Sequence, residues 1–149
     1  MSVITVEKNT PSRQIRRSVL ALLAGMLTAI ILSLGTDVGL HAVGLTPALG
    51  QPMSDPWLLL ATTYRTVYGV IASYIIARLA PNRPLRHALI GGFIGLFASI
   101  VGAVATWNSG FGPHWYPLSL IVLALPPAWI GAKLREMQLR SQTAATTAS

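Results

Sequence analysis

Four apolar segments alternate with short polar segments along this chain. They cover about residues 16–44, 57–79, 85–107 and 114–136. Each contains at least the roughly 20 residues that an α-helix needs to cross the hydrocarbon core of a bilayer. Because lipid offers no partners to backbone N–H and C=O groups, segments of this length are expected to be helical. The pattern therefore predicts an all-α fold, an integral membrane four-helix bundle.

The three connections between these segments contain turn-forming residues. Residues 46–56 hold three prolines and a glycine, residues 81–84 read Pro-Asn-Arg-Pro, and residues 108–113 read Asn-Ser-Gly-Phe-Gly-Pro. Such clusters end helices and favour turns. Short connections make consecutive helices antiparallel neighbours. We therefore expect an up-down-up-down arrangement in a single membrane domain covering residues 1–149.

The two ends of the chain are more polar than the segments between them. Residues 1–15 are expected to form a flexible cytoplasmic tail, and residues 140–149, rich in Thr, Ala and Ser, are expected to be disordered. The first apolar segment could be mistaken for a signal peptide. It is longer than the roughly 7–15 apolar residues of such a signal, so we expect it to remain as a helix.

The composition supports a membrane protein. Only 10% of the residues are charged and 52% are hydrophobic, whereas soluble domains carry about 25% charged residues. The formal net charge of +7 comes from Lys and Arg that flank the apolar segments. Because these clusters do not interleave with aromatic residues, they do not indicate a nucleic-acid surface. The expected partner is the lipid bilayer, with a homo-oligomer or a larger membrane complex as further possibilities.

The placement of the basic residues predicts an orientation. Lys and Arg lie before the first segment, around residues 81–84 and after the last segment, whereas 46–56 and 108–113 contain none. By the positive-inside rule, both termini and the 81–84 turn are cytoplasmic. Four aromatic residues then lie at the outer interface: Trp57, Trp107, Trp115 and Tyr116.

The third segment carries a stripe of small residues at four-residue spacing, namely Gly91, Gly95, Ser99 and Ala103. Such a stripe allows another helix to approach closely. It can serve packing within one chain or a homodimer face, and in a four-helix protein we favour packing within the chain.

Adjacent prolines, Pro126 and Pro127, lie inside the fourth segment. Each proline removes a backbone donor and crowds the carbonyl one turn earlier, around Val122 and Leu123. A kink is therefore expected there.

Asp37 and Arg65 are charged residues inside apolar segments. An ionisable residue within a membrane helix is costly and marks a functional site by default, so its partner should be named. Asp37 lies eight residues before Leu45, and Arg65 lies eight residues after Trp57, which puts both about 12 Å inside the outer ends of their helices. The two residues should reach similar depth and pair.

Other polar residues are expected around this pair in the outer half of the bundle. The candidate intramembrane polar pocket consists of Asp37, Arg65, His41, Tyr64, Tyr68 and His114. One interpretation is structural, with the ion pair locking two helices in register, and it is favoured because buried pairs often serve specificity. The other is a site open to the exterior, where Arg65 holds an anion or Asp37 and His41 handle protons.

Catalytic motifs are not found in the sequence. Cysteine is absent, Asp37 has no acidic neighbour at similar depth, and no nucleophile motif, phosphate loop or metal-ligand spacing occurs. We expect no metal, no cofactor and no enzymatic activity.

Several stretches resemble those of small bacterial inner-membrane proteins: LSLGTDVGLHAVG, TTYRTVYGVIASYIIARLAP, AVATWN and WYPLSLIVLALPPAWIGAKLR. The resemblance covers roughly residues 16–136. It implies a bacterial origin, a location in the inner membrane and a compact four-helix unit, and it implies no particular activity.

The expected function is that of a non-enzymatic accessory subunit, or of a binder of a small ligand or lipid in the outer half. One alternative is an oligomeric transporter or channel subunit, because four helices enclose little pore. The other alternative is a membrane enzyme that acts on a lipid or a quinone.

Overall fold

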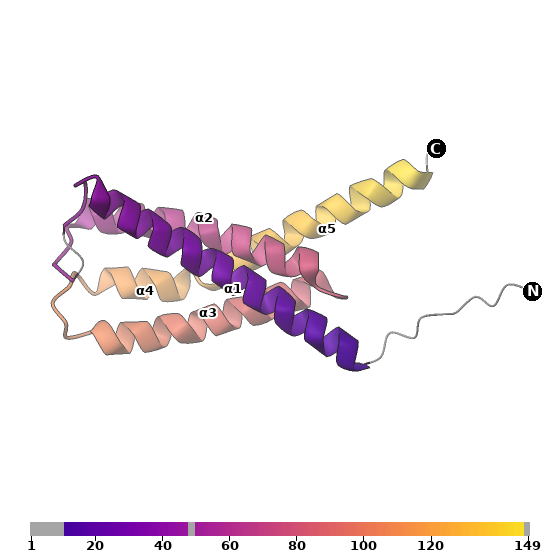
Figure 1. The fold of residues 1–149 in the computed structure, drawn as a ribbon, viewed down its shortest axis with the longest axis horizontal. Coiled ribbons are helices and arrows are strands. Elements are labelled where there is room, and N and C mark those ends of the chain that lie inside the picture. Colours follow the sequence, from indigo (N-terminus) through magenta and orange to yellow (C-terminus); the bar gives the residue numbers. More distant parts are fainter. Residues whose placement is uncertain (1–10, 48–49, 148–149) are drawn as a thin grey trace, which may run out of the picture.

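The computed structural model describes residues 11–47 and 50–147. Within these residues the chain is helical and contains no strand. The described helices are α1 (Pro11–Ala42), α2 (Asp55–Leu79), α3 (Pro84–Thr106), α4 (Trp115–Val122) and α5 (Leu125–Thr147) (Figure 1). Only Leu123 and Ala124 separate α4 from α5. The predicted all-α fold with four helical segments is therefore confirmed for the described part of the chain.

The ends of α1 differ from the prediction. The helix begins at Pro11 rather than at residue 16 and ends at Ala42 rather than at residue 44. The flexible tail predicted for residues 1–15 is therefore wrong for 11–15, and residues 1–10 lie outside the described residues. Proline favours the first turn of a helix because its fixed φ is already helical, so the helix starts before the apolar segment does.

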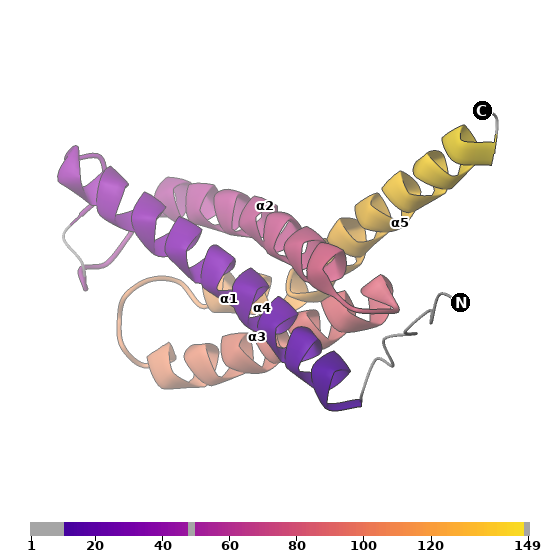
Figure 2. The same cartoon turned by 45° about the vertical axis from the view of Figure 1, so that its right-hand side comes forward.

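The end of α5 also differs from the prediction. This helix continues to Thr147, so the disorder predicted from residue 140 is wrong for 140–147, and 148–149 lie outside the described residues. The segment after residue 139 includes Arg, Gln and Ala, which favour a helix even where no apolar face packs against another helix. The last turns of α5 project past the other helices in both views of the ribbon (Figures 1 and 2).

Three helical stretches are long and apolar enough to cross a membrane: Pro11–Ala42, Pro84–Thr106 and Trp115–Thr146. The helix α2, which we also expected to span, is not one of them. It contains Arg65 and several Tyr and Thr residues. Neighbouring helices cover part of this polar helix. It packs against α1, α3 and α5 and contributes six buried residues.

Glycine allows α2 to approach its neighbours closely. A Cβ atom on Gly25 of α1 would lie 2.7 Å from the carbonyl oxygen of Ala72, and one on Gly131 of α5 would lie 2.5 Å from the carbonyl oxygen of Val70. No side chain fits at either crossing. At these crossings α1 and α5 each pack directly against the backbone of α2.

The small-residue stripe of α3 is divided between packing and open space. A Cβ on Gly91 would lie 2.6 Å from Cδ1 of Ile76, and Ala103 is buried. In contrast, a Cβ on Gly95 would meet no described atom of another helix within 4 Å, and Ser99 is only half-buried. The packing within the chain that we favoured is therefore present at Gly91 and missing at Gly95.

The predicted kink at Pro126 and Pro127 is present as a full break between α4 and α5. The N–H of Leu123 still donates to the carbonyl of Ser119, at 2.9 Å. After the break, Pro127 packs on Gly69 of α2, where an added Cβ would lie 3.1 Å from the proline ring. The break therefore lets α5 follow a different direction from α4 while it remains packed on α2 (Figure 1).

Two ends of the bundle can be distinguished. At the first, which we call the loop end, the connections after α1 and after α3 meet, and the N–H of Met53 donates to the carbonyl of Phe111 at 3.0 Å. At the second, which we call the basic end, the start of α1 meets the start of α3 through a 2.8 Å hydrogen bond between Ser18 and buried His87. Exposed arginines of α1, α2 and α3 surround this basic end.

Candidate functional site

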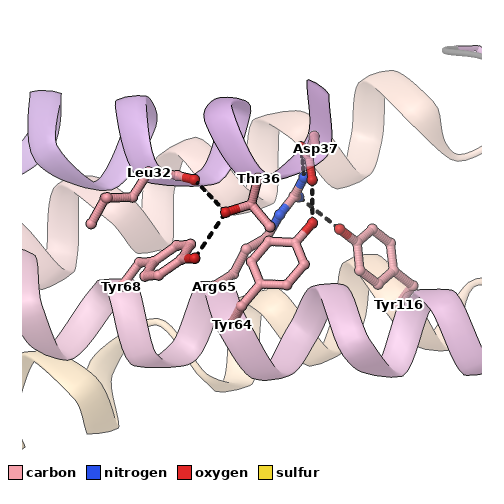
Figure 3. A network of polar contacts seen from close by, with 7 residues as sticks. All are labelled: Leu32, Thr36, Asp37, Tyr64, Arg65, Tyr68 and Tyr116. Carbon is pink, nitrogen blue, oxygen red and sulfur yellow. Dashed lines mark hydrogen bonds and ion pairs between the residues drawn. The ribbon is translucent and has the colours of Figure 1, made fainter. Parts of the chain in front are cut away.

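An ion pair joins α1 to α2. Nη2 of Arg65 donates to Oδ2 of Asp37 at 2.7 Å (Figure 3). The side chains are 32% and 22% exposed, respectively. The pairing expected from equal depth along the two helices is therefore present in the structure, and both charged groups remain partly accessible.

Two tyrosines complete the polar network around this pair. The hydroxyl of Tyr64 donates to Oδ1 of Asp37, so both carboxylate oxygens accept a hydrogen bond. On the other side, Nη1 of Arg65 donates to the hydroxyl of Tyr116 at 2.6 Å. The network thus links α1, α2 and α4 (Figure 3). Each charge is compensated within the network, which is the condition under which charged groups persist in an apolar surrounding.

A second, smaller contact lies one helical turn farther from the loop end. Thr36 donates its hydroxyl proton to the carbonyl of Leu32, at 2.9 Å. Its oxygen therefore accepts the 2.8 Å hydrogen bond from the hydroxyl of Tyr68. Tyr68 follows Tyr64 by four residues, so the two rings lie on one face of α2, with centroids 5.6 Å apart.

The start of α4 is held in place at the loop end. Nε1 of Trp115 donates to Oδ1 of Asp55 at 3.0 Å, which connects α4 to the first turn of α2. Ser119 donates its hydroxyl to the carbonyl of Tyr116 at 2.7 Å. These contacts, together with the break after Val122, bring the Tyr116 side chain to Arg65.

A cavity opens at the loop end, and we call it the loop-end cavity. Its volume is about 330 Å³. Its lining combines Asp37, Tyr64, Arg65 and Tyr116 of the polar network with residues of both connections, including Met53 and Phe111. The ion pair therefore forms the floor of a cavity whose rim is made by the loops.

A second and larger cavity lies among the helices, and we call it the helix groove. Its volume is about 500 Å³. It is lined by α1, α2, α3 and both helices that follow, and most of its lining residues are Gly, Ala, Ile and Leu. Asp37 and Arg65 line this groove as well as the loop-end cavity. The ion pair therefore lies where the two cavities meet.

The two predicted histidines do not join the network. The side chain of His41 is exposed and lines neither of these two cavities, although it lies on the same face of α1 as Asp37. His114 lines the loop-end cavity, but its ring stacks on Trp107 with centroids 4.3 Å apart, and Nε2 lies 3.0 Å from the Trp107 carbonyl. The predicted proton handling by Asp37 with His41 therefore has no supporting contact.

The main contribution that sequence reasoning missed is the role of Tyr116 as a partner of Arg65. Its aromatic character at a helix end predicted only an interfacial position. The rotation of α4 depends on the break before Pro126, and no periodic pattern in the sequence fixes that rotation. The groove was also missed, although Gly95 and Ser99 form part of its wall.

The arrangement leaves hydrogen-bond donors of Arg65 that could bind polar oxygen atoms. In the described residues no cluster of three or more His, Asp or Glu side chains could hold a metal ion. Arg65 has five N–H donors, and its contacts in the described part of the chain use one on each Nη atom. Donors therefore remain for an oxygen-bearing group in either cavity.

Comparisons of the chain with protein-family models, with curated proteins and with solved structures found no match. Its function therefore has to be inferred from the geometry of the bundle.

Proposed function

We propose that this chain is a non-enzymatic membrane protein that binds a small amphiphilic ligand, a lipid or a lipid-like molecule, between its helices. The observation that carries the proposal is the place of the Asp37–Arg65 pair at the meeting point of the loop-end cavity and the helix groove. A ligand with its apolar part in the groove would have its polar part at the ion pair. Ligand sites of this kind are mostly apolar, with a few polar groups that fix the orientation.

The proposed arrangement in the membrane has all four helical segments spanning in up-down-up-down order, with both termini in the cytoplasm of a bacterium. The support is the concentration of Lys and Arg at the basic end, and their absence from residues 46–56 and 108–113. In this arrangement α2 spans despite its polar residues, because its neighbours cover much of it. The loop end would then face the exterior of the inner membrane.

The ion pair would also have a structural role. It fixes the register between α1 and α2, and a ligand site gains from a scaffold whose polar groups are already in position. Both roles are compatible, because the pair is partly exposed to the cavities.

A binder is favoured over a transporter subunit by the lining of the groove. Its charged side chains in the described residues, Asp37 and Arg65, lie at the loop-end side. Toward the basic end the wall is mainly apolar, with residues such as Gly25, Met26 and Ile76, and Ser73 adds one small hydroxyl. A transported charged or strongly polar solute would need more polar groups along that part. The proposal also includes an accessory role, in which the chain assembles with a second copy of itself or with a larger membrane complex.

The proposal is tested with the full chain purified in a mild detergent and analysed by native mass spectrometry for retained lipid. The test variant is Gly95→Leu, which fills the groove from a position where an added Cβ meets no described atom within 4 Å. The matched control is Gly102→Leu, on the same helix and equally open, but not part of the groove lining. We expect the wild type and Gly102→Leu to retain an amphiphile and Gly95→Leu to lose it. Equal retention by all three proteins would refute the proposal.

A further inference from the structure

The helix groove has the length of a hydrocarbon chain. Gly25 and Asp37 of α1 both line it, and they lie twelve residues apart, which is about 18 Å along a helix. This exceeds half of the roughly 30 Å hydrocarbon core of a bilayer. An extended acyl or prenyl chain could therefore lie in the groove parallel to the helices, within about one leaflet of the membrane.

The open side of the groove lies between α1 and α3. On α1, the lining residues Ile30 and Leu34 are 49% and 57% exposed, and on α3 the lining residue Ile94 is 37% exposed. In contrast, the lining residues Ala72 and Ile76 of α2 are buried. Because the exposed edges are apolar, this opening would face lipid chains in a membrane. A ligand could therefore enter sideways from the bilayer without crossing the loop end.

The polar end of the groove has no net charge. Asp37 is the carboxylate and Arg65 the guanidinium, and they are the charged side chains in the groove lining within the described residues. They neutralise one another at 2.7 Å. A ligand that brought its own phosphate or carboxylate would leave one charge uncompensated in a partly buried place, and such a charge is strongly unfavourable.

The network nevertheless retains hydrogen-bonding capacity. Nε of Arg65 is enclosed and has no partner among the described residues. Each Nη atom uses one of its two N–H groups, for Tyr116 and for Asp37, so the partly exposed guanidinium can still donate to a ligand oxygen. Asp37 is partly exposed and can still accept a hydrogen bond from a ligand hydroxyl.

From this geometry we infer that the ligand is a single-chain amphiphile with an uncharged head that carries carbonyl or hydroxyl oxygens. The chain lies in the helix groove, and the head oxygens bind Arg65 and Asp37. The inference rests on the proposed function and names its ligand class. Acylglycerols, long-chain alcohols and prenylated quinones share this chemistry, whereas anionic phospholipids and ionised fatty acids do not.

The test uses two probes with the same acyl chain and different charge. Monooleoylglycerol has an uncharged head, and monooleoyl lysophosphatidate is its phosphate ester. Binding of each probe to the purified full chain in a mild detergent is measured by native mass spectrometry titration. We expect the wild type to bind monooleoylglycerol at least about tenfold more tightly than monooleoyl lysophosphatidate, as a ratio of the two Kd values.

Two variants examine the charge argument. Asp37→Asn keeps the shape and leaves Arg65 uncompensated, so the preference should shift toward lysophosphatidate by at least about tenfold. The double variant Asp37→Asn/Arg65→Gln has no charge at all and should keep the preference for monooleoylglycerol. It also keeps the test valid if the single variant fails to fold.

The outcomes separate this inference from the proposed function. If the wild type bound lysophosphatidate as tightly as monooleoylglycerol, the inference would be overturned and the proposed function would stand. If the wild type bound neither probe, and Gly95→Leu behaved like Gly102→Leu, both would be overturned. A preference between the two probes that Asp37→Asn left unchanged would also contradict the inference, because binding would then depend on the acyl chain and not on the charge of the ion pair.

Discussion

Toward the basic end, the tightest contacts of α2 with its neighbours are made at glycine and alanine, whereas toward the loop end a network of hydrogen-bonding side chains joins the helices. Gly25 and Gly131 place helices so close that a Cβ would collide with backbone atoms of α2, and Ala77, Ala88 and Ala132 form a buried cluster. Nearer the loop end, Asp37, Arg65 and Tyr116 connect helices that leave cavities between them.

The difference shows how a small membrane protein can combine a rigid part with an open part. Lipid is as apolar as the helices, so close packing and interhelical hydrogen bonds rather than the hydrophobic effect hold them together. The glycine crossings provide the close packing, and the Asp37 network provides the interhelical hydrogen bonds. Because the network needs only a few contacts, cavities remain beside it.

The largest effect is expected from Gly131→Leu, which places a side chain into the crossing of α2 and α5. Because the neighbouring atoms are backbone and cannot move aside, the loss of folding free energy should exceed about 3 kcal/mol. Gly95→Leu, with no described atom within 4 Å of the added Cβ, should change it by no more than about 0.5 kcal/mol. Reversible unfolding in mixed micelles measures both. Similar losses would contradict the division into a close-packed and an open part.

The next effect concerns the ion pair. Asp37→Asn should cost about 2–3 kcal/mol, less than the 3–5 kcal/mol typical of a fully buried pair, because both side chains are partly exposed. The double variant Asp37→Asn/Arg65→Gln should recover part of the loss. The control is Glu136→Gln, which removes the 2.8 Å contact with Lys133 on α5 and should cost at most about 0.5 kcal/mol. Strictly additive losses in the Asp37/Arg65 cycle would contradict a coupled pair.

A smaller effect is expected from Tyr116→Phe, which removes the hydroxyl that accepts from Nη1 of Arg65. The donor retains access to the cavity, so the cost should be about 1 kcal/mol. Tyr74→Phe is the control, because the Tyr74 hydroxyl bonds Gln138 at an exposed position. Thermal unfolding should show a larger decrease for Tyr116→Phe. The reverse order would mean that α4 is not held by the network.

The smallest effect is expected from Thr36→Val, which removes the hydrogen bond from Tyr68. Interhelical hydrogen bonds in membranes contribute about 0.6 kcal/mol on average, and a loss of this size is expected. Thr63→Val serves as control, because the Thr63 hydroxyl bonds the carbonyl of Leu59 in its own helix at an exposed position. If the control lost as much stability, the contact between α1 and α2 at Thr36 would contribute nothing.

The helices and the ion pair were accessible from the sequence for simple reasons. Apolar length determines where helices lie, so the bounds of α2 and α3 agree with the prediction within two residues. Asp37 and Arg65 could be paired because the relative depth of residues along two helices joined by one short loop follows from residue counting. The prolines predicted a kink before Pro126, because their effect on a helix is local, and the structure has a break there.

Other features depend on how the helices rotate and pack, which counting does not provide. His41 shares the four-residue spacing of Asp37, yet its side chain is exposed. Tyr116 reaches Arg65 only because α4 ends at Val122 and has its own orientation. The predictions of a flexible tail before α1 and of disorder at the end of α5 were wrong, because both helices continue into polar residues beyond the apolar segments.

The most direct test of the central claim, a ligand site in the helix groove, is the thermal stabilisation of three proteins by monooleoylglycerol. A ligand that binds the folded state and not the unfolded state raises the unfolding midpoint, and the rise grows with the ratio of its concentration to its Kd. We predict that the midpoint rises for the wild type and for Gly102→Leu and stays constant for Gly95→Leu. Equal shifts in all three proteins, or no shift in the wild type, would contradict the claim.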